Sequence, residues 1–253
     1  MQRLDDRICL ITGASSGLGA HFARITAGAG ARVVLAARRR DRVEALAAEI
    51  AAAGGAALPV TMDVSDEISV SAAYDEAEAT FGTIDTIIAN AGVAAPGRST
   101  EISAGAMLGV LETNLLGVLL TAREGARRLL AVGSRESGLG RIVLIGSITA
   151  EMTGPGDTIY CASKAAVAHL GRNLAKEWVR LGICVNVIQP GYIQTELAKD
   201  WFSSEGGKAQ IAGFNRRRLQ PVNSLDAPLL YLCSDAAAHT TGAIFTIDDG
   251  QLL

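Results

Sequence analysis

The sequence predicts a doubly wound α/β domain, in which a seven-stranded parallel sheet is covered by helices on both faces. Three features predict it: seven short runs rich in Val, Ile and Leu, helical segments between them, and a glycine-rich turn after the first run. The runs span residues 8–12, 32–36, 57–61, 86–90, 141–147, 184–189 and 243–247. Polar residues do not alternate with apolar ones in them, as strands buried on both faces require.

The segments between the runs have the period of one-sided helices. Val43, Leu46, Ala47 and Ile50 recur at the spacing i, i+3, i+4, i+7, and residues 167–181 repeat this pattern. Strands that alternate with helices imply right-handed crossovers and a parallel sheet, whose ligand crevice opens at the carboxyl ends of the strands. We find no repeat and no linker, so residues 1–253 are expected to form a single domain.

Composition and charge exclude several classes of function. The chain has 253 residues, 49% of them hydrophobic, with 23 basic and 26 acidic side chains and a net charge of −3. No global positive field attracts nucleic acid or an anionic membrane surface. The start of the chain lacks the apolar core of a signal peptide, so we expect a soluble, cytoplasmic protein. The 4 cysteines and 3 histidines are scattered, which indicates no metal site.

A glycine-rich turn follows the first predicted strand and precedes a helix. Glycines at this place let the backbone approach a pyrophosphate, which the amides of the helix N-terminus then hold. A tight turn without a ligand is the alternative, but the position of the turn after the first buried strand favours dinucleotide binding. The turn supplies the candidate cofactor residues Gly13, Ser15, Ser16, Gly17, Leu18 and Gly19.

The end of the second predicted strand indicates which dinucleotide binds. An acidic residue about 20 positions after the glycines is typical of an NAD site, but Ala37 stands here, followed by Arg38, Arg39 and Arg40. Guanidinium groups can hold a 2′-phosphate with paired hydrogen bonds. We therefore expect NADP(H) to be preferred over NAD(H), with Arg38 and Arg39 as candidates. Alternatively these arginines only solvate the start of a helix, an interpretation that suits Arg40 best and Arg38 least.

A serine, a tyrosine and a lysine form the candidate catalytic group. Ser147 follows the fifth predicted strand, and Tyr160 and Lys164 stand four residues apart at the head of the next helix. That spacing places both side chains on one helix face, so the ammonium can favour the phenolate. A tyrosine with a lowered pKa can act as an acid or a base near neutral pH.

With these motifs together, the chain resembles the short-chain dehydrogenase/reductase family, 250-residue type, over essentially its whole length. The resemblance implies a Rossmann-like domain and an active-site asparagine at Asn114. It also implies that Tyr160 and Lys164 contact the cofactor. Further cofactor contacts are implied at Asp63, Val64, Asn90, Ala91, Gly92, Pro190, Gly191, Ile193 and Thr195.

The same resemblance implies a role for each catalytic residue. Tyr160 protonates the carbonyl oxygen of the substrate, and Ser147 hydrogen-bonds that oxygen. Lys164 lowers the tyrosine pKa and binds the nicotinamide ribose. Asn114 kinks its helix and supports a water-linked proton relay, and no metal is required.

The resemblance places a substrate lid at about residues 195–220, with a plausible hinge at Gly206 and Gly207. Trp201 and Phe202 are adjacent aromatics in a chain with only 4% aromatic residues, which favours an apolar or bulky substrate. The alternative is that they only attach the lid to the body. The remaining candidates for the substrate pocket are Ala94, Pro96, Met152, Gly154 and Tyr192.

We therefore expect an NADPH-dependent carbonyl reductase that is reversible as a secondary-alcohol dehydrogenase, with a small-molecule ketone or alcohol as its only partner besides copies of itself. One alternative is a 3-oxoacyl-[acyl-carrier-protein] reductase, with Arg123, Arg127, Arg128 and Arg172 as the docking patch for an acidic carrier. A second alternative is a non-catalytic NADP-binding regulator. Family members of this kind are usually tetramers, so a homotetramer is expected.

Overall fold

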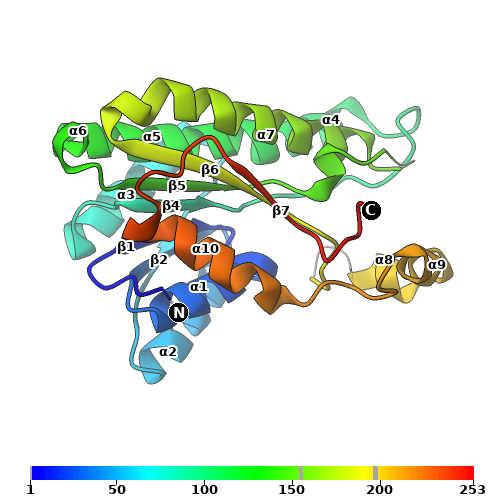
Figure 1. Cartoon of the computed structure of the whole chain (residues 1–253), viewed down its shortest axis with the longest axis horizontal. Coiled ribbons are helices and arrows are strands. Elements are labelled where there is room, and N and C mark those ends of the chain that lie inside the picture. The colour runs from blue at the N-terminus through cyan, green and yellow to red at the C-terminus, as the bar shows by residue number, and fades with distance from the viewer. Residues whose placement is uncertain (1, 154–155, 196–198) are drawn as a thin grey trace.

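The computed structural model describes residues 2–153, 156–195 and 199–253 and has an all-parallel sheet at its centre (Figure 1). In the described residues the sheet has seven strands: β1 (Ile8–Thr12), β2 (Arg32–Ala37), β3 (Ala56–Thr61), β4 (Thr86–Ala89), β5 (Gly140–Ile145), β6 (Ile183–Pro190) and β7 (Ile244–Ile247). Each corresponds to one of the seven predicted runs, and the doubly wound α/β class is confirmed.

The order of the strands creates a crevice at the centre of the sheet. The order is β3-β2-β1-β4-β5-β6-β7, so the chain first builds outward from β1 and then returns to add β4 on its other side. Crossover helices leave β1 and β4 toward opposite edges, and a gap opens between them at the carboxyl ends of the strands. The glycine-rich turn and the segment after Ala89 both lie at this gap.

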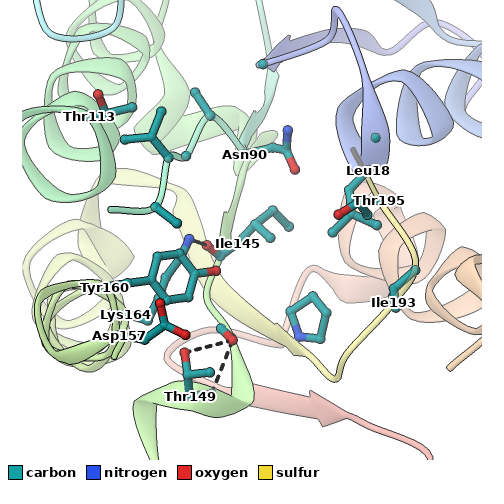
Figure 2. A pocket seen from close by; sticks show the side chains of 18 of the residues that line it. Leu18, Asn90, Thr113, Ile145, Thr149, Asp157, Tyr160, Lys164, Ile193 and Thr195 are labelled. Atoms are coloured by element: carbon teal, nitrogen blue, oxygen red, sulfur yellow. Dashed lines mark hydrogen bonds between the residues drawn. The ribbon is translucent and has the colours of Figure 1, made fainter. Parts of the chain in front are cut away.

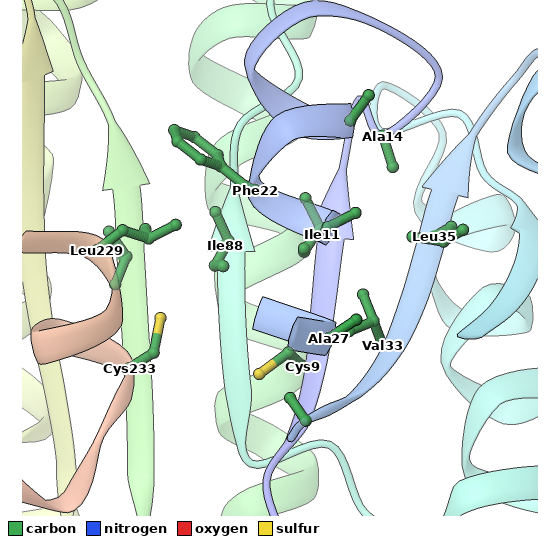
Figure 3. Packing of buried hydrophobic residues seen from close by; sticks show 14 of the residues in the cluster. Cys9, Ile11, Ala14, Phe22, Ala27, Val33, Leu35, Ile88, Leu229 and Cys233 are labelled. Carbon is green, nitrogen blue, oxygen red and sulfur yellow. The ribbon is translucent and has the colours of Figure 1, made fainter. Parts of the chain in front are cut away.

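Successive strand residues point to opposite faces, and a layer of helices covers each face (Figure 1). One layer packs on strand residues such as Ile11 and Ile88, which gather with Phe22 and Leu229 of the helices (Figure 3). It consists of α1 (Gly17–Gly28), α2 (Arg40–Ala52) and α10 (Asp226–Cys233). The opposite layer packs on neighbours such as Leu10 and Ile87, and consists of α3 (Glu67–Phe81), α5 (Gly117–Ala131) and α7 (Thr158–Trp178).

The two edge strands correct one expectation. β1, β4, β5 and β6 are buried along their whole lengths, but β3 and β7 are largely part-exposed. An edge strand has a neighbour on one side only, so the helices cannot cover its open flank as well as they cover a central strand. Burial on both faces therefore holds for the inner strands.

The other elements connect these layers. They are α4 (Ala104–Leu111), the π-helical turn η1 (Glu112–Leu116), α6 (Ser134–Ser137), α8 (Lys199–Ser203), α9 (Glu205–Gly213), and the short helices η2 (Ile148–Ala150), η3 (Val179–Leu181), η4 (Val222–Leu225) and η5 (Asp235–Ala237).

The continuous helical stretch Ala104–Ala131, formed by α4, η1 and α5, is 28 residues long, and an 18-residue window within it has a mean hydropathy of 1.5. By length and composition alone it is apolar enough to cross a membrane. Core helices of soluble proteins can meet the same criterion, and here Val118, Ala122 and Ala126 pack in the layer on the sheet. The expectation that the protein has no membrane partner stays a prediction.

Two buried arginines close the amino-terminal edge of the sheet. Arg7 pairs with Asp235 and Asp85, and its Nη1 donates to the carbonyl oxygen of Leu139 at 2.6 Å. The guanidinium of Arg141 donates to three backbone carbonyls, among them Gly138 at 2.8 Å. Because a guanidinium group is costly to bury without partners, these hydrogen bonds hold the loops at the amino-terminal ends of the strands in place. The carboxyl ends, where the crevice opens, lie on the opposite side of the sheet.

A left-handed glycine at the entry to β6 should be sensitive to substitution. Gly182 has φ +73°, and a Cβ built on it would overlap the carbonyl oxygen of Ser134. We expect Gly182→Ala to lower the free energy of unfolding by about 3 kcal/mol, from backbone strain plus the clash. Gly54→Ala is the control, because Gly54 has φ +85° with no atom within 4 Å of its Cβ position. Its cost should be only about 1 kcal/mol. Urea unfolding of the two variants checks this, and equal losses would contradict it.

Candidate active site

A cavity of about 1040 Å³ opens at the carboxyl ends of the central strands. It brings together most of the residues singled out from the sequence. Those that line it are Gly13, Ser15, Ser16, Gly17, Leu18, Arg38, Arg39, Asp63, Val64, Asn90, Ala91, Gly92, Ala94, Pro96, Ser147, Met152, Tyr160, Lys164, Pro190, Gly191, Tyr192, Ile193, Thr195, Trp201 and Phe202. Gly19 and Asn114 lie behind the wall, and Gly154 lies outside the described residues.

The glycine-rich turn is attached to the end of β4 by a close set of hydrogen bonds. The Thr12 hydroxyl accepts from the backbone N–H groups of Asn90 and Ala91, both at 3.0 Å, and Asn90 Nδ2 donates back to the Thr12 carbonyl at 2.9 Å. A Cβ on Gly13 would lie 2.9 Å from the Cα of Ala91, and one on Gly19 would overlap the Gly13 carbonyl. Glycine is required at both positions by this close packing, and Gly19 contributes through the shape of the turn.

The arginines after β2 divide between two sites. Arg39 donates to the hydroxyls of Ser15 and Ser16 in the glycine-rich turn, at 2.8 and 2.9 Å. Arg38 extends into the same cavity, where its Nη1 lies 3.9 Å from a carboxylate oxygen of Asp63. Arg40 forms an exposed ion pair with Glu44 at 2.8 Å, one helical turn away. Two guanidinium groups thus border the cavity beside the turn, and Arg40 belongs to the helix surface.

Asp63 is oriented by its own loop. Its Oδ1 accepts from the Ser65 hydroxyl at 2.6 Å and from the Ser65 N–H at 3.0 Å, and the hydrogen bond of the hydroxyl holds the pKa of the carboxyl below its usual value. The carboxylate therefore stays ionised and fixed at the cavity wall, close to Arg38.

Ser147 lies two residues beyond the end of β5 and lines the cavity. Its Oγ accepts hydrogen bonds from the N–H of Thr149 at 3.2 Å and from the Thr149 hydroxyl at 2.9 Å. Because these two bonds occupy the lone pairs, the proton of Ser147 is left to donate to a group in the cavity. Thr149 is thus a positioning residue.

Tyr160 and Lys164 lie on one face of α7, as their spacing predicts, and Lys164 Nζ is 5.6 Å from the centre of the Tyr160 ring (Figure 2). The Lys164 side chain is buried, whereas Tyr160 is partly exposed toward the cavity. Burial lowers the pKa of Lys164 to about 8, because an ammonium is poorly solvated there. Within the described residues, Lys164 Nζ donates to the Ile145 carbonyl at 2.9 Å.

The expected direction of the Tyr160 pKa is wrong for the protein alone. Burial raises this pKa to about 12, and a hydrogen bond with Ser147 lowers it only in part. The physical reason is that desolvation of the phenolate outweighs the favourable interactions that reach the phenol oxygen. Tyr160 is therefore a neutral phenol at physiological pH in this structure.

Asn114 interrupts a long helix. It lies in the π-helical turn η1 between α4 and α5, and is fully buried. Its Oδ1 accepts from the Val93 N–H at 2.8 Å, and its Nδ2 donates to the Val93 carbonyl at 2.9 Å and to the Ser163 hydroxyl at 3.2 Å. The amide thus joins the loop after β4 to the catalytic helix α7.

The segment after β6 covers one side of the cavity. Thr195 faces the glycine-rich turn, 3.7 Å from a Cβ built on Gly17, and lies near Leu18 (Figure 2). The ring of Tyr192 packs edge-on against that of the buried Phe202, with the ring centroids 5.6 Å apart. Trp201 is 53% exposed, and its indole N–H donates to the side-chain oxygen of Gln210 at 2.7 Å. Phe202 thus anchors α8 to the body and also lines the cavity, while Trp201 is available at the rim.

Sequence reasoning missed Thr149, Asp157 and Gln210, all of which line the cavity. Asp157 immediately precedes α7, where an acidic residue is usually an N-cap, and no motif distinguished it from one. Thr149 and Gln210 lie in segments without a recognisable pattern.

Comparisons with known proteins agree with this geometry. A family model described as short chain dehydrogenase matches residues 7–206. The chain is 36% identical to the cis-4-hydroxycyclohexanecarboxylate dehydrogenase of Sinomonas cyclohexanicum, over 97% of this chain and 96% of that protein. It is also 36% identical to the D-threitol dehydrogenase of Mycolicibacterium smegmatis, over 99% and 95%.

A gluconate 5-dehydrogenase from Burkholderia cenocepacia, solved in complex with NADP and tartrate, superimposes with a TM-score of 0.92 at 31% identity. The match covers 99% of this chain and 96% of that one. The chain therefore belongs to the short-chain dehydrogenase family, as an oxidoreductase that acts on alcohol or ketone groups with a nicotinamide cofactor.

Proposed function

We propose that this protein is an NADP(H)-dependent carbonyl reductase that also oxidises secondary alcohols. One observation carries the proposal: Ser147, Tyr160 and Lys164 face the same cavity as the glycine-rich turn and the two arginines after β2. A proton donor, a hydrogen-bond donor and a phosphate-binding turn are thus adjacent, as carbonyl reduction with a dinucleotide requires.

The residues present fit a dinucleotide. The turn has glycines where a Cβ would collide with its neighbours. Within the described residues the buried ammonium of Lys164 donates to one backbone carbonyl, which leaves N–H donors for a bound hydroxyl. We propose that Arg38 and Arg39 hold the 2′-phosphate, that Asp63 and Val64 contact the adenine, and that Lys164 binds the nicotinamide ribose. The bound cofactor supplies the hydride.

Tyr160 is the proposed acid. As a neutral phenol it can donate its proton to the ketone oxygen, while the Ser147 hydroxyl, oriented by Thr149, donates a hydrogen bond to the same oxygen. The nearby ammonium of Lys164 stabilises the phenolate that this transfer leaves. In alcohol oxidation the same groups act in reverse, with the phenolate as base.

Asn114 is proposed to support the proton relay through its backbone. Its side-chain amide is occupied by Val93 and Ser163. A π-helical turn leaves carbonyl groups without their usual helical partners, so a water held by the Asn114 carbonyl is the route we propose between Lys164 and solvent.

The cavity suits a substrate with an apolar or bulky part. Met152, Tyr192, Trp201 and Phe202 provide apolar walls, and Ala94 and Pro96 leave room between them. We propose that residues 195–220 form a substrate lid, of which 196–198 lie outside the described residues. By their names, two curated relatives act on a carboxylate-bearing ring alcohol and on a neutral sugar alcohol. Relatives thus include enzymes for charged and for neutral substrates.

The carrier-protein alternative is less favoured by the surface of the protein. It needs free arginines for an acidic partner, but Arg123 pairs with Glu67, and Arg128 pairs with Asp75, Glu78 and Glu124. These carboxylates neutralise much of the predicted patch.

We propose a homotetramer in the cytoplasm. On the long helix after β4, Leu108 is 54% and Leu116 44% exposed, although both are large apolar residues. A second copy that covers this helix would remove them from water.

Replacement of the proposed acid should separate binding from chemistry. We expect Tyr160→Phe to lower kcat for ketone reduction by roughly 10²–10⁴-fold, since only the proton donor is lost, with the Kd for NADPH within about twofold of the wild type. Steady-state rates and fluorescence titration check this. Undiminished turnover would exclude the role of Tyr160, and cofactor binding without turnover by the wild type would favour the regulator alternative.

The preference for NADP(H) depends on two of three consecutive arginines. We expect Arg38→Ala and Arg39→Ala each to raise the Kd for NADPH by about tenfold or more, and the Kd for NADH by less than about threefold, because each loses a charged partner of the phosphate. Arg40→Ala is the matched control and should change neither constant, since Arg40 pairs with Glu44 outside the cavity. Tighter binding of NADH than of NADPH by the wild type would contradict the proposal.

The buried ammonium should leave a signature in stability. The pKa of Lys164 is about 8 in the folded protein against 10.5 for a free lysine, so between pH 8 and 10 the unfolded chain binds more protons and stability rises with pH. Over this range we expect the free energy of unfolding of the cofactor-free wild type to rise by about 2 kcal/mol relative to Lys164→Met. Urea unfolding at several pH values measures the difference. An identical pH dependence of the two proteins would show that the ammonium is not desolvated.

A further inference from the structure

Asp157 places a carboxylate in the catalytic cavity next to the proposed acid. It stands at the N-terminal end of α7, three residues before Tyr160, yet its side chain makes no capping hydrogen bond with the helix. It lines the cavity instead, and its carboxylate lies beside the Tyr160 ring (Figure 2).

This carboxylate has no hydrogen-bond or ion-pair partner within residues 2–153, 156–195 and 199–253 of the structure. Partial burial raises the pKa of this carboxyl. Burial is the main cause of the raised pKa values of Tyr160 and Cys161 on α7 and of Tyr192 after β6, and the charge of Asp157 adds to all three. The carboxylate therefore faces the space that these three residues enclose.

The charges along the cavity are divided between its two ends. The cations of the described lining are Arg38 and Arg39 beside the glycine-rich turn, and Lys164, which donates to the Ile145 carbonyl. Beyond Tyr160 the charged side chains of the described lining are Asp157 and Asp200. A substrate carboxylate at this end would meet a like charge with no counter-ion among the described lining residues. A substrate hydroxyl could instead donate to the Asp157 carboxylate, which has no donor among those residues.

We propose that Asp157 is a specificity-determining residue that accepts a hydrogen bond from a substrate hydroxyl next to the reacting carbonyl and rejects substrates with a carboxylate there. The proposal rests on the carbonyl reductase function proposed above. Asp157 and Tyr160 both line the cavity, and the carboxylate lies beside the Tyr160 ring (Figure 2), so the two groups can contact neighbouring oxygens of one molecule. The substrate class is a neutral hydroxyketone or the corresponding vicinal diol.

Three ketones that differ in one substituent test this. All carry an ethyl group on the carbonyl: 3-pentanone has a second ethyl group, 1-hydroxy-2-butanone a hydroxymethyl group, and 2-oxobutanoate a carboxylate. We would measure kcat/KM of the wild type, Asp157→Asn and the control Glu151→Gln with the preferred cofactor. Glu151 carries the same charge, is exposed and lies outside the cavity lining. Titration with the cofactor shows whether each variant is folded.

For the wild type we expect kcat/KM for 1-hydroxy-2-butanone to exceed that for 3-pentanone by at least about tenfold, since 3-pentanone lacks the hydroxyl that would donate to the charged carboxylate. The ratio over 2-oxobutanoate should be larger, because its carboxylate is also repelled by that of Asp157. Asp157→Asn should lower kcat/KM for the hydroxyketone by about tenfold and raise kcat/KM for 2-oxobutanoate. Its kcat/KM for 3-pentanone should stay within about threefold of the wild-type value. Glu151→Gln should keep the wild-type ratios.

Other results would overturn the inference. An equal loss on all three ketones would make Asp157 a positioning residue for Tyr160, and unchanged ratios would show that it does not contact the substrate. Reduction of none of the three ketones by the wild type with either cofactor would overturn the proposed function itself, and the inference with it.

Discussion

The contact between the ends of β1 and β4 is the constraint on which the rest of the site depends. Parallel strands all end at one edge, but only a change of winding direction opens a crevice there. Thr12 and Asn90 fix the width of that crevice, because each bonds the backbone of the other's strand. With this distance fixed, Gly13 and Gly19 have no room for side chains, and α1 begins at Gly17 on the cavity wall.

The catalytic helix is held to the same frame by a different kind of bond. Asn114 joins the loop after β4 to Ser163, and Lys164 donates to the last residue of β5. Both are buried polar groups that would be costly to leave unpaired. Their partners therefore hold α7 in register with the strand ends. Burial in the site raises the pKa of Tyr160 and lowers that of Lys164. The protein alone therefore favours a neutral phenol and an ammonium that loses its proton more readily than a free lysine does.

The sequence predicts features that depend on local patterns. The inner strands, the turn and the Tyr160–Lys164 face all follow from spacing along one element. It does not predict how a single side chain is oriented across elements. Arg39 contacts Ser15 and Ser16, 24 and 23 residues earlier, although Arg38 was the favoured phosphate contact. Asp157 has the sequence of an N-cap, but does not cap its helix. The spacing of Tyr160 and Lys164 predicts that the ammonium lies near the phenol and lowers its pKa. It does not predict the burial of the phenol, which raises that pKa.

The division of charge along the cavity has a physical rationale in the chemistry proposed for it. Cations beside the turn match a phosphate-bearing cofactor, and a cation placed equally freely near the substrate would attract the same phosphates to the wrong end. Among the described lining residues, the cation near Tyr160 is Lys164, which is instead buried and donates to the Ile145 carbonyl. Burial, and to a smaller extent the Asp157 carboxylate at the far end, raises the pKa of Tyr160, so the proposed acid stays protonated in the protein alone.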